Sequence, residues 1–181
     1  MLERVNKNPH MVHFVLKRNK NFPNSALPVL IYQKVLNLPD QKSKAAEIIQ
    51  KIFARNKWTN SWRNSIYDFH HYHSITHECM GIGEGTATVI LGGPGGKRVK
   101  LSKGDVIILP AGVAHKCLKF SQHFLCAGAY PGGKDYDIKT GTDIEYAQAM
   151  ENIKKISVPE NDPVFGDNGF LKTYWKKDDM P

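Results

Sequence analysis

The sequence predicts an all-β protein, a sandwich or barrel of short strands with two flanking α-helices. Three observations lead to this fold class. Residues 65–130 form short strand-like runs separated by glycine-rich turns such as Gly92-Gly93-Pro94-Gly95-Gly96, a spacing typical of sandwiches and barrels. Two apolar, β-branched runs precede this region. Apolar residues also recur at helical spacing on either side of it.

The two N-terminal runs, residues 11–16 and 27–32, predict two strands. Residues 21–25 between them are of the kind that forms turns. Pro28 cannot donate a backbone hydrogen bond, so it favours the start of a strand or an edge position. We expect both strands to pack beside the central region.

Two helices are predicted, one on each side of the strand-rich region. The first lies within residues 40–57 and would cover one sheet with a single apolar face: Ala45, Ile48, Ile49, Ile52 and Phe53. The second begins at the capping-box pattern of Thr142 and Glu145. Its apolar face is predicted to comprise Ile144, Ala147, Met150 and Ile153. The tail from Val158 to Trp175 is predicted to wrap the surface and to dock at its end.

The chain of 181 residues is long enough to bury a substantial core, and we expect it to form one domain. Within that domain, residues 1–64 would supply N-terminal strands and the covering helix. Residues 65–130 would form the barrel core, and residues 131–181 a C-terminal helix and wrapping tail.

The composition excludes several classes of partner. Residues 1–64 carry twelve lysines and arginines against three acidic residues, but these are scattered and form no basic cluster, so nucleic-acid binding is not expected. No apolar run approaches the ~20 residues of a membrane helix, and no signal-peptide core follows the N-terminus. The three cysteines form no Cys-x-x-Cys pair, which favours buried thiols in a cytoplasmic protein.

Four side chains of the kinds that bind divalent transition metals lie in two segments: His71, His73, Glu78 and His115. If the flanking segments are strands, His71 and His73 share a face, roughly 6.5–7 Å apart along the backbone. His77 competes with Glu78 for the inward position. Because the residues alternating with Glu78, Met80 and Ile82, are apolar, Glu78 is favoured as the inward residue.

The first segment resembles the first motif of the cupin superfamily. His71, His73, Glu78 and Gly85 fall at the spacing of that motif. Ser65 stands where a glycine is usual, and this departure touches no candidate metal ligand.

The second segment resembles the second cupin motif. Gly104, Pro110, Gly112 and His115 match it, and Lys119 replaces the usual asparagine. This departure also leaves the candidate ligands intact.

Further segments extend the resemblance over nearly the whole chain, to the small single-domain bacterial YjlB-like cupins. The segments that carry it are residues 22–24, Trp58, 62–64, 71–74, 77–78, 92–93, 110–112, 128–131 and 162–164. The resemblance implies a double-stranded β-helix, or jelly-roll barrel. It supplies no reaction.

Carried over residue by residue, the resemblance implies that His71, His73, Glu78 and His115 hold one divalent transition metal per chain, with two open positions. Fe, Mn, Ni, Co, Cu and Zn all suit such ligands. The predicted pocket residues are Tyr67 and Phe69, on the face of His71 by alternation, together with Met80 and Cys117, which has the parity of His115.

The predicted function is that of a metal-dependent enzyme acting on a small polar metabolite, anionic ones included. Dioxygenase-like oxidation is favoured because Tyr67 is the only candidate able to exchange a proton, and no catalytic residue is assigned. A metal-dependent isomerase, epimerase or hydrolase is the alternative. A non-catalytic cupin that binds or senses a small molecule is the alternative of another class. The resemblance also implies a homodimer, formed through the strands at 11–16 and 27–32.

Overall fold

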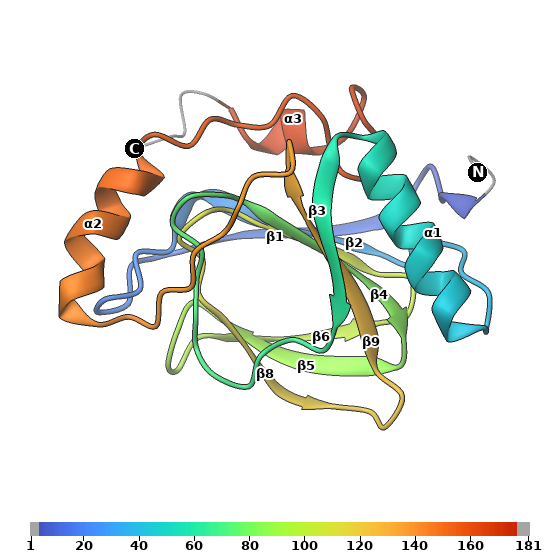
Figure 1. The fold of residues 1–181 in the computed structure, drawn as a ribbon, viewed down its shortest axis with the longest axis horizontal. Coiled ribbons are helices and arrows are strands. Elements are labelled where there is room, and N and C mark those ends of the chain that lie inside the picture. Colours follow the sequence, from blue (N-terminus) through green and yellow to red (C-terminus); the bar gives the residue numbers. More distant parts are fainter. Residues whose placement is uncertain (1–3, 177–181) are drawn as a thin grey trace.

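The computed structural model describes residues 4–176. Two antiparallel β-sheets face each other and form a jelly roll (Figure 1). The strands are β1 (His10–Leu16), β2 (Ser25–Gln33), β3 (Trp58–Asn64), β4 (Glu78–Glu84), β5 (Thr86–Leu91), β6 (Lys97–Ser102), β7 (Val106–Leu109), β8 (His115–Phe120) and β9 (Leu125–Pro131). One sheet has the order β1-β2-β7-β4-β9-β3 and the other the order β6-β5-β8. The predicted all-β jelly roll with flanking helices is confirmed.

The centre of the larger sheet is β4, which pairs with β7 on one side and β9 on the other. Side chains alternate across a strand, so Met80 and Ile82 face the second sheet and contribute to the core between the sheets. Cys79 belongs to a second core on the outer face of the larger sheet. The alternation predicted for this strand is therefore present.

Helix α1 (Lys42–Arg55) covers the outer face of the larger sheet and contacts β3, β4 and β9 (Figure 1). Its approach to β4 is close, because a Cβ at Gly81 would lie 2.6 Å from the Cγ2 of Ile49. Only glycine allows this contact. The helix buries Ala46, whereas the predicted face has Ile48, which is only partly buried.

Helix α2 (Asp143–Ile153) begins with the predicted capping box: the Thr142 side chain accepts from the Glu145 N–H, and the Glu145 carboxylate accepts from the Thr142 N–H. Of its predicted apolar face, Ile153 is buried and Met150 partly buried, but Ile144 and Ala147 were wrong. Ile144 is 92% exposed, and the helix buries Ala149 together with Ile153. The reason is the docking direction: Ala149 packs beside Tyr72, so the first turn extends into solvent.

The tail crosses the outer face of the larger sheet and includes a short helix, α3 (Leu171–Tyr174) (Figure 1). The buried Asp162 carboxylate anchors it by accepting from the Tyr32 hydroxyl at 2.5 Å and from the backbone N–H groups of Val164, Phe165 and Leu171. As predicted, Trp175 is docked: it is buried, and its indole N–H donates to the Pro28 carbonyl at 2.8 Å.

Strand β3 was not predicted, because its sequence is polar and shows no alternation. It forms the edge of the larger sheet beside β9, with an irregular register between Thr59 and Trp62 and a left-handed backbone at Asn60 (φ 52°). Pairing with β9 and packing against α1 outweigh the weak intrinsic preference of these residues for a strand.

Two further expectations concern cysteines and membranes. Cys79, Cys117 and Cys126 are free and buried, as predicted. Across residues 4–176, none of the helices has the length and apolar character needed to cross a membrane.

His77 points to the opposite face of the sheet from Glu78 and holds the tail. Its Nδ1 accepts from the Ala111 N–H at 2.9 Å, and its Nε2 donates to the Ser157 carbonyl at 3.3 Å. The ring packs 4.7 Å from the Trp175 ring. Burial lowers the pKa of His77 to about 4, so the ring is neutral at pH 7.

This lowered pKa predicts a loss of stability in acid. Between pH 6.5, the ordinary histidine pKa, and pH 4, the unfolded chain binds a proton that the folded His77 does not. The free energy of unfolding should therefore fall with pH in this window, by about 3 kcal/mol in full. His77→Gln keeps a donor and an acceptor but does not titrate.

The measurement is urea unfolding of the metal-free protein and of His77→Gln between pH 7.5 and 4.5. Shared titrating groups cancel in the difference between the two proteins. The stability of the wild type should fall more steeply below pH 6.5, and a pH-independent difference would contradict the assignment.

Candidate metal centre

His71 and His73 lie in residues 67–77, a segment that is not the regular strand considered from the sequence. It is held instead by two isolated bridges. His71 exchanges backbone hydrogen bonds with His115, and Tyr72 exchanges them with Lys139. These bridges still place His71 and His73 on one side and Tyr72 on the other. Tyr72 packs toward Phe22 and α2.

The other two side chains start strands. Glu78 opens β4 on its inner face, and His115 opens β8 after the turn at residues 110–112. Gly112 has a left-handed backbone (φ 90°), and its N–H donates to the His73 carbonyl at 2.8 Å. A Cβ there would lie 2.4 Å from the Asn24 carbonyl oxygen. Glycine is therefore needed to bring the second segment against the first.

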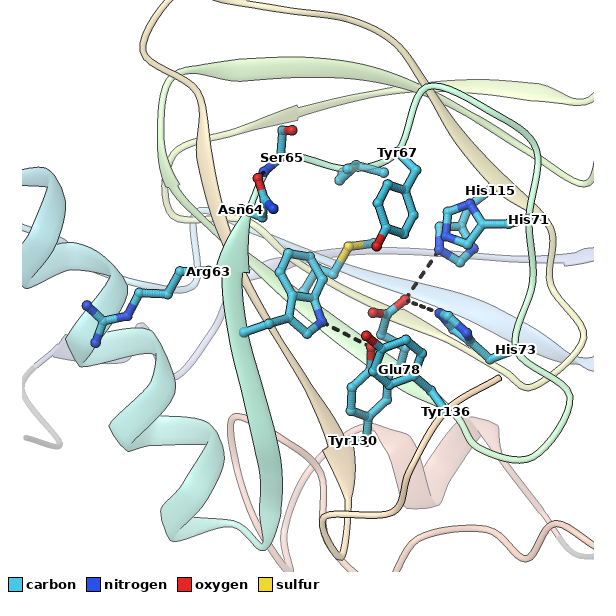
Figure 2. Close-up of a pocket in the computed structure, with 13 residues that line it drawn as sticks. Arg63, Asn64, Ser65, Tyr67, His71, His73, Glu78, His115, Tyr130 and Tyr136 are labelled. Carbon is cyan, nitrogen blue, oxygen red and sulfur yellow. Dashed lines mark hydrogen bonds and ion pairs between the residues drawn. The ribbon is translucent and has the colours of Figure 1, made fainter. Parts of the chain in front are cut away.

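The four predicted ligands meet at one place (Figure 2). One ring nitrogen from each of His71, His73 and His115 lies within 4.8 Å of the others. The Glu78 Oε2 atom lies 3.3 Å from Nε2 of His73 and 3.3 Å from Nε2 of His115. All four side chains are buried.

The orientation of each imidazole is fixed by its Nδ1. This atom lies 3.1 Å from the Phe69 carbonyl in His71, 2.5 Å from the Asp137 carbonyl in His73, and 3.1 Å from the Val113 carbonyl in His115. A carbonyl can only accept, so Nδ1 carries the proton. In a neutral ring Nε2 is then an unprotonated acceptor. Backbone carbonyls commonly hold metal-binding histidines in this way.

These acceptors converge on another acceptor. Glu78 Oε2 is buried and has no hydrogen-bond partner among the described residues. Unprotonated imidazole nitrogens at 3.3 Å from a carboxylate oxygen repel it unless a cation lies between them. Nitrogen and oxygen donors of this kind suit a divalent transition metal. The residues present therefore fit a metal ion.

The pKa shifts of the metal-free groups also show that the buried Glu78 carboxylate attracts positive charge. Burial would raise the pKa of Glu78, but the attraction of His73, followed by the contact with His115, outweighs burial and lowers it. Burial lowers the pKa of His73, yet the Glu78 charge raises it above its ordinary value. The pKa of His71 falls to about 3 through burial and the nearby His115. Glu78 is therefore ionised, and without a metal a proton on His73 compensates its charge.

Asp137 supports His73 beyond its carbonyl. Its carboxylate accepts from the Ser74 N–H at 2.6 Å and the Ser74 hydroxyl at 2.5 Å. Asn152 of α2 donates to the same hydroxyl at 2.9 Å. Sequence reasoning missed Asp137, which is 64 residues from His73 and stands in no motif that would mark it.

A cavity of about 170 Å³ adjoins the cluster (Figure 2). Its lining residues are Trp62, Arg63, Asn64, Ser65, Ile66, Tyr67, His71, His73, Glu78, Met80, His115, Tyr130 and Tyr136. Of the predicted pocket residues, Tyr67 and Met80 belong to this lining. Phe69 stacks on Tyr67 at 5.0 Å without lining the cavity. Cys117 is buried in the core between the sheets, also outside the lining.

Three aromatic residues of the cavity were missed by sequence reasoning. The indole N–H of Trp62 donates to the Tyr130 hydroxyl at 3.1 Å, and the Tyr130 ring stacks on Tyr136 at 4.8 Å. Burial, followed by the Glu78 charge, raises the pKa of Tyr130 well above its ordinary value. Alternation along β9 could have identified Tyr130, whereas the polar sequence of β3 concealed Trp62.

Comparison with known proteins gives one related sequence and several similar folds. No family model matches the chain. Uncharacterized protein YjlB from Bacillus subtilis is 38% identical over 160 residues, which cover 88% of this chain and 92% of YjlB.

Among solved structures, RmlC from Streptococcus suis in complex with dTDP-D-xylose is 13% identical, covering 94% of this chain and 97% of RmlC (TM-score 0.39). Acireductone dioxygenase from Bacillus anthracis, with a cadmium ion in its active centre, is 19% identical, covering 60% and 80% (TM-score 0.41). Likenesses of this size carry no argument about the reaction.

The relationship to YjlB spans almost the whole of both chains, and it agrees with the jelly roll and with the two histidine-bearing motifs. The chain belongs to the YjlB family of cupins.

Proposed function

We propose that the protein is a metal-dependent enzyme acting on a small molecule in the cavity beside His71, His73, Glu78 and His115. One observation carries this proposal. The Nε2 atoms of His73 and His115 and the Oε2 atom of Glu78 are acceptors that face one another in a buried space. Such an arrangement favours a bound cation, which a proton on His73 replaces in the metal-free protein, and the adjoining cavity gives a ligand access to it.

The three imidazoles and the Glu78 carboxylate would hold one divalent transition metal. When bound, the metal would supply a Lewis acid and, if it is redox-active, a centre for reaction with O2. The chain supplies the orientation of the ligands through the carbonyls of Phe69, Val113 and Asp137. Ile66 and Met80 contribute apolar side chains to the lining.

Oxidation of the ligand by O2 is the reaction we propose. Among the described residues that line the cavity, the imidazoles are committed to the cluster, and Tyr130 stays protonated. Apart from its tyrosines, the described lining thus offers no general base. Oxidation demands fewer protein acids and bases than isomerisation or hydrolysis does.

Isomerisation or hydrolysis is a second candidate, because of Tyr130. Its hydroxyl accepts from the Trp62 indole and keeps its own proton beside Glu78, facing the cavity (Figure 2). A proton held at this atom can be given to a ligand oxygen.

Non-catalytic binding or sensing of a small molecule is the remaining alternative. Turnover measurements separate it from both enzymatic candidates.

We also propose that the protein works in the cytoplasm as a homodimer. The three free, buried thiols fit a reducing compartment. The β1 strand is an edge of the larger sheet, with unpaired backbone groups that a second chain could pair with.

The homodimer predicts a mass in solution of twice the 20.4 kDa of the chain, which light scattering measures. A monomeric mass would contradict the dimer.

The metal assignment predicts the metal content of variants. Purified wild-type protein should hold close to one divalent metal per chain, and the His71→Ala/His115→Ala double variant less than about a tenth of that, because it lacks two of the four ligands. His70→Ala is the matched control, since its ring lies beside Phe22 and outside the cluster. Elemental analysis decides: equal metal in the double variant and the control would refute the assignment.

The same variants predict a difference in thermal stability. Metal at a hundred times its dissociation constant adds about 2.7 kcal/mol to the stability of the folded state. This should raise Tm by roughly 5–10 °C in a chain of this size. The shift should appear in wild type and His70→Ala on adding zinc(II) after chelation. If the double variant shows it equally, the metal binds elsewhere.

The reaction class is tested with iron(II)-loaded protein and a pool of small metabolites. Oxidation predicts O2 consumption and products heavier by oxygen. Isomerisation predicts no O2 consumption, deuterium uptake from heavy water, and loss of this exchange in Tyr130→Phe. If the protein retains a ligand but turns over no metabolite with any metal loaded, the non-catalytic binding function is the one supported.

A further inference from the structure

The cavity beside the candidate metal centre is walled by aromatic rings. Tyr67 meets the His71 ring edge-on at 5.1 Å, and Tyr136 meets the His73 ring edge-on at 5.4 Å. Trp62 also lines this cavity, which Figure 2 shows with Tyr67 and Tyr136 on its wall. Aromatic faces bind flat apolar groups by stacking and by edge contacts.

Trp62 is held rigidly. Its indole lies directly over Gly128 of the neighbouring strand, where a Cβ would come within 2.3 Å of the ring. Its N–H is engaged by the Tyr130 hydroxyl. Any side chain at position 128 would displace the indole. The sheet thus provides a flat, preformed wall that needs no rearrangement on binding.

Among the described residues, the lining directs no lysine or arginine side chain toward the cluster. Apart from the histidines, Arg63 and Glu78 are its charged members. The Arg63 Nε donates to Gln50 of α1, and the side chain points away from the cluster (Figure 2). A carboxylate or phosphate on the ligand, away from the metal, would therefore be desolvated without a partner.

We propose that the cavity selects ligands whose metal-binding oxygen atoms are attached to a flat, uncharged body, such as an aromatic or conjugated ring. This inference rests on the proposed metal site. The volume of about 170 Å³ corresponds to about five or six water molecules in the liquid, which suits one small ring. This narrows the predicted ligand class, which had included anionic metabolites.

Three hydroxamates with the same metal-binding group test the inference on zinc(II)-loaded protein. Acetohydroxamate has a methyl body, benzohydroxamate a flat neutral ring, and 4-carboxybenzohydroxamate the same ring with a negative charge. Calorimetric titration should show benzohydroxamate binding at least about tenfold more tightly than acetohydroxamate, because of apolar burial and stacking. The carboxylated probe should bind at least about tenfold more weakly than benzohydroxamate.

Two variants test whether the Trp62 wall causes the preference for benzohydroxamate over acetohydroxamate. Trp62→Leu removes the wall, and Gly128→Ala keeps every aromatic residue while displacing the indole. In both, the affinity ratio of benzohydroxamate to acetohydroxamate should fall about fivefold, with zinc content measured for each protein. Phe120→Ala is the control, an exposed aromatic residue outside the lining, and should keep the wild-type ratio.

The outcomes separate the two proposals. Zinc-loaded wild type that binds acetohydroxamate and benzohydroxamate equally, or prefers the carboxylated probe, would overturn the ligand class and leave the metal site standing. A ratio unchanged in Trp62→Leu and Gly128→Ala would overturn the role of the wall. Wild type that holds no zinc would instead refute the metal site, and the ligand class with it.

Discussion

The burial of the Glu78 carboxylate among imidazole acceptors is the constraint on which the rest of the centre depends. A buried charge is costly unless it is paired, and here its neighbours Nε2 of His73 and His115 are themselves acceptors. Their orientation is imposed by backbone carbonyls on the far side of each ring. The strand ends, the tight turn before His115 and the Asp137 loop all serve to hold this arrangement, which a cation resolves.

Much of this arrangement could be predicted because it is local. Alternation on β4 identifies Glu78 as the inward residue and His77 as the outward one, and the structure places them on these faces. The strands and the capping box at Thr142 depend on neighbouring residues in the same way. The spacing of histidines in two segments is also local, so the candidate ligands could be named before their convergence was visible.

The rest could not be predicted, because it depends on pairs that are distant in sequence. Strand β3 forms through pairing with β9, and its polar sequence carries no signal of this. Trp62 becomes a cavity wall only because Gly128 lies beneath it. Asp137 supports His73 through a carbonyl, an atom that every residue has. The exposed Ile144 shows the converse: helical spacing predicted a buried face, but docking at the other end of α2 decided the outcome.

His77 and Glu78 are neighbours at the start of β4, and they contact two different parts of the molecule. Glu78 faces the cluster, while His77 holds the Ser157 carbonyl and packs against Trp175. The start of β4 is thus common to ion binding and to closure of the C-terminal segment. A displacement of the start of β4 would therefore disturb the contacts of both side chains at once.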